Sequence, residues 1–377
     1  MVGTMALIIV LSVFNGFEGL ITSLFNAFNP DFSITAAKGK TFDFDEFPED
    51  EIKKIPGVFA VTQVVEENAL LKYRDKQYIA TVKGVSGEFE KMSGVDTMLI
   101  DGKFVLKEGG IPRMIMGAGV AYYLGASLLD LLNPITVYVP QREGFLSTNP
   151  DKAFVSKNIF PSSVFSIQQE FDSRYVVVPV EFMRELLNYN NEVTSVEIGI
   201  EKGYSTDEIE TRIKKILGPG FSVKNRFEQE ELLYKIMRSE KWAIFFILTF
   251  ILIIATFNVI SSLTMLILDK KKDIAVLHSM GASNRLIRRI FLTEGIMISV
   301  GGALSGLIIG GLISWIQQNY GIISLGGGSG SFVVDAYPVK IILSDFFLVF
   351  ATVVVIGFLA AWYPAKRISE KYLSQKL

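Results

Sequence analysis

Residues 243–268 read AIFFILTFILIIATFNVISSLTMLIL, an apolar run without a single charge. As an α-helix this run is about 39 Å long, which exceeds the roughly 30 Å hydrocarbon core of a bilayer. Residues 295–320 form a second uncharged run. Residues 346–365 form a third, which contains Trp362 and Tyr363, side chains typical of the membrane interface. The sequence therefore predicts an α-helical membrane protein.

The opening residues 1–17, MVGTMALIIVLSVFNGF, are also apolar. They lack the basic start and the small-residue cleavage site of a signal peptide. We interpret residues 1–28 as the first transmembrane helix, and we expect its native beginning to lie upstream of Met1. The other expected spans are residues 241–268, 290–320 and 343–365.

The loop 269–289 and the tail 366–377 are rich in Lys and Arg. Short basic loops stay in the cytoplasm, so we expect this loop and both termini inside the cell. Residues 29–240 and the connection 321–342 then lie outside. In a bacterium this places the chain in the inner membrane, with the large region in the periplasm.

The region 29–240 is long enough for one large domain. Strand patterns (58–65, 69–73, 78–82, 135–139, 175–178 and 195–200) alternate with helix patterns (45–55, 119–125, 179–189 and 205–217). We therefore predict four transmembrane helices with a large α+β periplasmic domain inserted between helices 1 and 2. From residue 227 a single helix is expected to continue into the second span.

Composition excludes several classes of function. Of 377 residues, 50% are hydrophobic and 20% are charged. The net charge of −2 does not indicate the basic surface that binds nucleic acid. The chain has no Cys and one His, so thiolate and histidine metal sites are not expected. The sequence contains no complete nucleotide-binding loop and no catalytic motif. We expect a non-catalytic chain that binds no cofactor.

The stretch 141–152, QREGFLSTNPDK, lies between the strand patterns ITVYVP and AFVSKNIF. Its Gly, Asn and Pro are typical of a solvated hairpin loop. The residues themselves favour this interpretation.

The loop at 269–289 contains DIAVLHSM at residues 273–280, a pattern for a short helix. Gly281 is expected to end it, and Ser283 to cap the helix that follows. Apolar side chains outside the bilayer need a partner. This helix either lies on the membrane surface or docks into a groove on a cytoplasmic protein.

Three glycines, Gly302, Gly306 and Gly310, recur every four residues in the third span. They leave one helical face bare, so another helix can approach closely. Packing within the subunit and a contact between subunits both fit this pattern.

Several stretches together resemble a known family. They are ALIIVLSVFNGFE at 6–18, FNVISSL at 257–263, LDKKKDIAVLHSMGAS at 268–283, IRRIFLTEGIMISVGGALSG at 287–306 and AAWYPAKRIS at 360–369. They resemble the permease subunits of the lipoprotein-releasing ABC transporter, LolC/LolE type, and more weakly the MacB-type and FtsX-type proteins.

The resemblance implies that a separate LolD-like ATPase dimer binds ATP and Mg²⁺ and drives this chain, which pairs with a second permease of the same or a related sequence. The short cytoplasmic helix would then be the coupling helix. Its candidate residues are Asp273, Ile274, Ala275, Leu277, His278, Met280 and Gly281.

The resemblance further implies that triacylated lipoproteins enter between helices 1 and 2 from the outer leaflet and pass to a LolA-like periplasmic carrier. Phe14, Phe17 and Phe257 are candidates for the substrate cavity, although they could simply face membrane lipids. The 141–152 stretch corresponds to the hook that the carrier grips, with candidates Gln141, Arg142, Phe145 and Leu146. The alternative is an FtsX-like regulator that relays ATPase motion to a periplasmic partner without transport.

Overall fold

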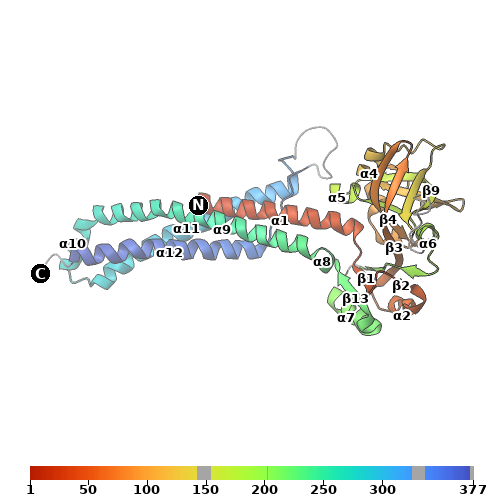
Figure 1. The fold of residues 1–377 in the computed structure, drawn as a ribbon. Helices are drawn as coiled ribbons and strands as arrows, with labels where there is room; N and C mark the ends of the chain where they lie inside the picture. The colour runs from red at the N-terminus through yellow and green to blue at the C-terminus, as the bar shows by residue number, and fades with distance from the viewer. Residues whose placement is uncertain (142–153, 202, 325–335, 374–377) are drawn as a thin grey trace. The chain divides into compact units, whose positions relative to one another are not determined.

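The computed structural model describes residues 1–141, 154–201, 203–324 and 336–373. The chain forms two compact units (Figure 1). The first contains Met1–Ile21 and Leu232–Leu377, and the second contains Thr22–Glu231. The second unit is therefore an insertion in the sequence of the first, as the sequence predicts.

The first unit is helical. Its elements are α1 (Val2–Phe28, which ends in the second unit), α9 (Glu231–Asp269), α10 (Lys271–Ser279), α11 (Asn284–Tyr320) and α12 (Leu343–Leu373). By length and composition, four helical stretches in the described residues are able to cross a membrane: Val2–Phe25, Glu231–Asp269, Asn284–Tyr320 and Leu343–Lys366.

The prediction of one unbroken helix from residue 227 is wrong at Glu230. Asn225 and Glu228 form a capping box that starts a separate short helix, α8 (Arg226–Gln229). The backbone of Glu230 then leaves helical geometry, with φ −117° and ψ 37°. From Glu231 onward the helix is continuous through Asp269.

Apolar side chains from four helices form the centre of the first unit. They are Leu7, Ile8 and Leu11 on α1, Phe245 on α9, Ala303 on α11, and Val349 and Val353 on α12. Because these contacts come from segments far apart in sequence, the cluster ties the first helix to the other three.

The three glycines of α11 lie against α1 of the same chain. A Cβ added at Gly306 would meet the Met1 carbonyl oxygen at 2.6 Å and the Thr4 Cβ at 2.7 Å. At Gly310 the nearest atom would be the Met5 carbonyl oxygen at 3.1 Å, and at Gly302 the Met1 nitrogen at 3.2 Å. Close packing within the subunit therefore occupies this face, the first of the two interpretations.

A buried carboxylate joins α1, α9 and α12. Oδ2 of Asp345 accepts hydrogen bonds from Nδ2 of Asn15 at 2.6 Å and from Nζ of Lys241 at 3.1 Å. Asp345 and Asn15 are both buried. Ionisable groups among apolar helices are costly unless they are paired, so this trio restricts how the three helices can separate.

The segment before α12 lies across the middle of α1. The Lys340 amide donates to the Ser12 carbonyl oxygen at 2.9 Å, and the rings of Phe17 and Tyr337 meet edge-on at 5.2 Å. A Cβ at Gly16 would lie 2.3 Å from the Pro338 carbonyl oxygen. Glycine at position 16 therefore permits the crossing.

The second unit is built on one large mixed sheet with the strand order β13-β1-β12-β3-β4-β10-β7-β9-β5. The strands on this path are β13 (Phe221–Asn225), β1 (Phe32–Ala36), β12 (Ser195–Ile200), β3 (Val58–Tyr73), β4 (Lys76–Val85), β10 (Tyr175–Pro179), β7 (Ile111–Gly117), β9 (Phe154–Phe165) and β5 (Leu99–Gly102). In addition, β8 (Ile135–Pro140) pairs with β3 and β9, and β6 (Lys107–Glu108) pairs with β7. Outside this sheet, β2 (Phe42–Asp43) pairs with β11 (Glu192–Val193).

Helices cover one face of the sheet with the main apolar core (Figure 1). The core helices are α2 (Glu49–Lys53), α4 (Ala118–Leu124), α6 (Val180–Leu187) and α7 (Thr206–Leu217). The remaining short helices are α3 (Phe89–Met92) and α5 (Gln169–Asp172). The predicted α+β architecture is thus confirmed for this unit.

Two local predictions need correction. The strand patterns at 58–65 and 69–73 belong to one continuous strand, β3, because β4 pairs along its second half without a break. The helix expected at 45–55 is divided into a 3-10 turn (Phe44–Glu46) and α2, since Pro48 between them has no N–H to continue a helix.

We predict that Gly306→Ala destabilises the first unit by about 1 to 3 kcal/mol, because its methyl group would force α11 away from α1. The measurement is thermal unfolding of the purified protein in detergent. Gly301→Ala is the matched control, since a Cβ there meets nothing within 4 Å. That control should be neutral or slightly stabilising, and equal effects of both substitutions would contradict the packing described.

Asp345→Asn should cost about 3 kcal/mol, because it removes the counter-charge of Lys241 while conserving volume. The control is Asp273→Asn, which breaks an exposed pair with Lys270 and should cost less than about 1 kcal/mol. Equal thermal stability of the two variants would show that the Asp345 trio does not hold the helices.

Candidate functional site

The short helix α10 ends in a well-defined motif. The Gly281 amide donates to the His278 carbonyl, and the Ala282 amide donates to the Leu277 carbonyl, which together form a Schellman cap. Gly281 has φ +94°, the left-handed region that favours glycine. The Ser283 hydroxyl then accepts from the Leu286 amide and caps α11. The predicted stop and cap are confirmed.

The apolar residues of α10 do not share one side. Ile274 is half-buried and packs against a cluster of Ile267, Ile287, Phe291 and Ala365. By contrast, Val276, Leu277 and Met280 are exposed, Met280 by 79%. Ile274 therefore anchors α10 to its own helices. Val276, which the sequence prediction did not include, joins Leu277 and Met280 on the exposed surface.

The other coupling-helix candidates lie on the solvent side of α10. Asp273, Ala275 and His278 are exposed, and Asp273 pairs with Lys270 at 3.1 Å. Nδ1 of His278 lies 3.1 Å from the Ala282 carbonyl oxygen. The imidazole thus supports the turn after α10.

The candidate hook connects two paired strands. β8 and β9 are antiparallel, with register from Ile135 opposite Ile159 to Pro140 opposite Phe154. Gln141 is exposed at the end of this ladder. Arg142, Phe145 and Leu146 lie outside the described residues. Residues 141–153 therefore connect two strands that are paired up to Pro140 and Phe154.

The three candidate cavity phenylalanines have different surroundings. Phe257 is 63% exposed, Phe14 is half-buried, and Phe17 packs against Tyr337. A cavity of about 250 Å³ is lined by Asn258, Val259, Ser262, Leu263 and Leu266 of α9 and by Ile298 of α11. Phe257 itself does not line that cavity.

A polar cavity that the sequence analysis missed lies within the second unit. Its volume is about 360 Å³, and five adjacent strands supply side chains to it. These are Ser33 and Thr35 of β1, Ser195 and Glu197 of β12, Glu66 of β3, Lys83 of β4 and Tyr175 of β10. In β12, Val196 and Ile198 face the main core, so the period of two turns Ser195 and Glu197 to the opposite face.

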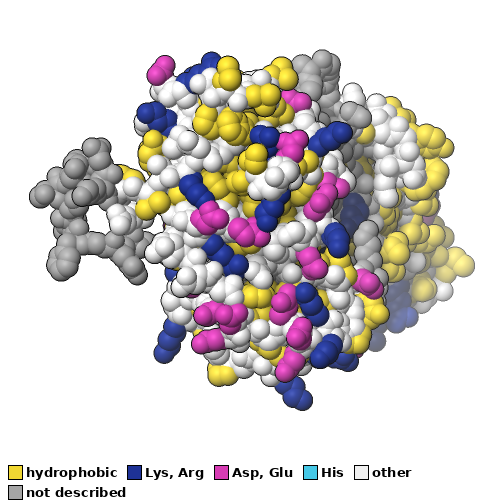
Figure 2. All heavy atoms as spheres, turned by 90° about the vertical axis from the view of Figure 1, so that its right-hand side faces the viewer, with side chains coloured by type: hydrophobic (Ala, Val, Ile, Leu, Met, Phe, Trp, Pro, Cys, Tyr) yellow, Lys and Arg dark blue, Asp and Glu magenta, His cyan; other side chains and the backbone are white. Residues whose placement is uncertain are grey.

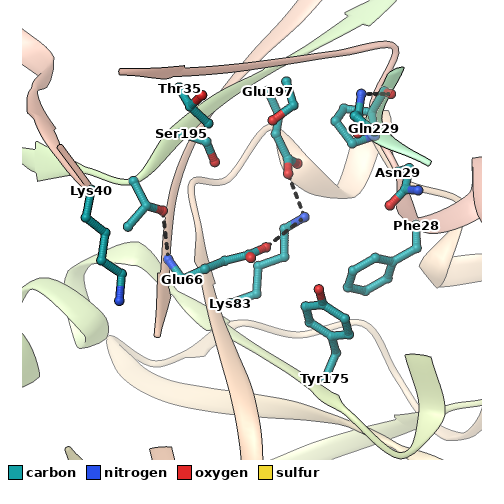
Figure 3. A pocket seen from close by; sticks show the side chains of 13 residues that line it. Phe28, Asn29, Thr35, Lys40, Glu66, Lys83, Tyr175, Ser195, Glu197 and Gln229 are labelled. Carbon is teal, nitrogen blue, oxygen red and sulfur yellow. Dashed lines mark hydrogen bonds and ion pairs between the residues drawn. The ribbon is translucent and has the colours of Figure 1, made fainter. Parts of the chain in front are cut away.

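A charged group is buried at the centre of this cavity (Figure 3). Nζ of Lys83 lies 2.6 Å from Oε1 of Glu197 and 3.6 Å from Oε1 of Glu66. It also lies 4.8 Å from the centre of the Phe28 ring and 5.3 Å from that of Phe89. Burial acts to lower the pKa of the Lys83 ammonium, but the two carboxylates outweigh it and raise that pKa.

Glu197 is buried almost completely, with 4% of its surface exposed. Its Oε2 has no hydrogen-bond partner among the described residues. Burial raises the pKa of the Glu197 carboxyl, against the opposing effect of the Lys83 ammonium. The sequence does contain a signal for this cavity, namely a single charged residue within each of the strand patterns ATVKGV and SVEIGI.

Neither the face drawn in Figure 2 nor the acidic side chains of the described ranges point to another kind of site. Figure 2 shows a face on which basic and acidic side chains alternate, without a patch of one sign that would suit nucleic acid. Within the described ranges, no three His, Asp or Glu side chains gather as metal ligands would.

Comparisons with known proteins cover both units. Residues 1–216 match the family described as MacB-like periplasmic core domain, and residues 245–373 match the FtsX-like permease C-terminal family. The protein LolE of the lipoprotein-releasing system of Haemophilus influenzae is 26% identical over 100% of this chain and 91% of its own length. LolC of Neisseria meningitidis serogroup B shows the same identity and coverage.

Among solved structures, the periplasmic region of MacB from Actinobacillus actinomycetemcomitans matches with a TM-score of 0.39 and 13% identity, over 55% of this chain and 94% of that one. The family match over residues 1–216 extends across more than half of the chain. The chain therefore belongs to the MacB-like periplasmic core domain family and is a MacB/FtsX-like permease of the LolC/LolE type.

Proposed function

We propose that this chain is the permease subunit of a bacterial inner-membrane ABC transporter that takes lipoproteins from the outer leaflet and passes them to a periplasmic carrier. A separate ATPase supplies the energy. The observation that carries the proposal is the match to LolE and LolC, proteins named for the lipoprotein-releasing system, along the whole chain. The proposed topology has four transmembrane helices, the second unit in the periplasm and both termini in the cytoplasm.

The α10 surface supports a cytoplasmic partner. Val276 and Leu277 on α10 and Met280 directly after it are exposed. A Schellman cap fixes the end of this helix, and Ile274 fixes its base. Exposed apolar side chains on a short capped helix suit insertion into a groove. The sequence has no nucleotide-binding loop of its own. We assign this surface to an ATPase dimer that binds ATP and Mg²⁺.

The β8–β9 hairpin supports a periplasmic partner. Paired strands up to Pro140 and Phe154 hold both ends of the 141–153 connection at one place. We assign this connection to the binding of a LolA-like carrier. The lipid-anchored substrate would pass between α1 and α9, near Phe14, Phe17 and Phe257, and a second permease of the same or a related sequence would complete the transporter.

For the ATPase contact, Leu277→Asp and Met280→Asp should each reduce capture of the purified ATPase at least about tenfold, because a charge replaces an apolar contact that is buried in the complex. Thermal stability of the permease alone should not change, because both side chains are exposed. Co-purification in detergent measures the capture.

Ile274→Asp is the contrasting variant. It should lower thermal stability, since Ile274 packs against apolar residues of α9, α11 and α12. Full ATPase capture by both Leu277→Asp and Met280→Asp would show that the exposed surface of α10 does not bind the ATPase.

For the carrier contact, replacing Phe145 and Leu146 with Ser should weaken capture of the periplasmic carrier at least about tenfold, because large apolar side chains are typical anchors at protein interfaces. Folding and ATPase activity of the assembled transporter should stay unchanged. Pull-down with purified carrier is the measurement.

The matched control is Leu131→Ser with Leu132→Ser, two exposed leucines in the loop before β8. That double variant should capture the carrier as the parent does. Undiminished capture after residues 142–151 are shortened to a two-residue turn would refute the hook and favour the FtsX-like regulator.

A further inference from the structure

The cavity in the second unit contains an acceptor that its own donors do not satisfy. The Lys83 ammonium is already engaged by Glu197 and Glu66 and lies over two aromatic rings. Oε2 of Glu197 is buried, and no described residue donates to it. A buried carboxylate oxygen without a donor is costly, so this position favours a ligand with a hydrogen-bond donor.

The charges around the cavity favour a cationic donor. Lys40, the second cation in the lining, forms its own ion pair with Glu67 at 2.7 Å. The remaining charged groups of the lining are one cation, Lys83, and two acids, Glu66 and Glu197. When both carboxyl groups are ionised, one negative charge has no counter-charge inside the cavity.

The walls and the volume indicate what kind of cation fits. The ring centres of Phe28 and Tyr175 lie 4.8 Å apart. Figure 3 shows the two rings next to each other, and aromatic faces attract ammonium groups. Hydroxyl groups of Ser33, Thr35 and Ser195 line the β1 and β12 side. A volume of about 360 Å³ exceeds that of a bare ion and lies within the range of small-molecule sites.

We propose that this cavity binds a small molecule with a primary ammonium group, whose N–H groups donate to Oε2 of Glu197 and to Glu66 beside the rings of Phe28 and Tyr175. A primary ammonium is preferred over a quaternary one because the Glu197 oxygen needs an N–H donor. The site lies entirely in the second unit. It goes beyond the proposed transport function and does not depend on it.

The test is a titration of the purified full chain in detergent with putrescine, followed by thermal unfolding and calorimetry. Putrescine should raise the unfolding temperature in a saturable way. Glu66→Gln should weaken the affinity about tenfold, the usual scale for one charge-assisted hydrogen bond. This variant should fold, because Glu66 is the more exposed of the two acids, and Glu197→Gln then gives a second measurement.

The control variant is Glu181→Gln, which removes the same charge from an exposed pair with Lys107 in the same unit and should bind putrescine as the parent does. Tetramethylammonium, which has the charge but no N–H, should not compete. Nα-acetyl-lysine amide carries the same ammonium group on a peptide-like molecule. Its affinity relative to that of putrescine therefore distinguishes a peptide ligand from a free amine. Absence of saturable binding to the parent, equal binding by Glu66→Gln, or full competition by tetramethylammonium would each overturn the proposal.

Discussion

The arrangement of the apolar helices depends on the hydrogen bonds that the Asp345 carboxylate accepts. This carboxylate accepts from Asn15 on α1 and from Lys241 on α9, so one side chain at the start of α12 connects three helices. Apolar side chains alone give helices in lipid little preference for one neighbour, because lipid tails offer equivalent contacts. A buried ion pair and the close approach at Gly306 are specific, since both are lost when the helices shift. They therefore define where α1 lies.

The second unit uses the two faces of one sheet for different purposes. One face carries the main apolar core, with Val196 and Ile198 of β12 among its members. The other face carries Glu197 next to Lys83, which is stabilised in its charged form by two carboxylates. Such a group contributes little net stability, because the cost of desolvation offsets the attraction. The buried charges of Lys83 and Glu197 are thus more readily explained by binding than by folding.

The two proposed contact surfaces share one design. On α10, Ile274 is held by the helices beneath it, and the Schellman cap orients the exposed Leu277 and Met280. On the β8–β9 hairpin, the strand register up to Pro140 and Phe154 holds both ends of the connection. In each case ordered backbone holds the ends of the segment for which we propose a contact. Pre-organisation of this kind lowers the entropy cost of binding.

The sequence alone predicted most of the apolar helices, several strands and the helix caps. Uncharged runs longer than a bilayer is thick predicted the apolar helices, and period-two patterns predicted strands such as β12 at its observed bounds. Gly281 and Ser283 predicted the end of α10 and the start of α11, because caps act within one turn of the chain. What only the tertiary structure decided involves residues far apart in sequence: the partner of Gly306, the inward side of Ile274, and the meeting of Glu66, Lys83 and Glu197 on adjacent strands. Local patterns determine which face a side chain points to, whereas strand order and helix packing determine what lies opposite, and those depend on contacts that no local pattern encodes.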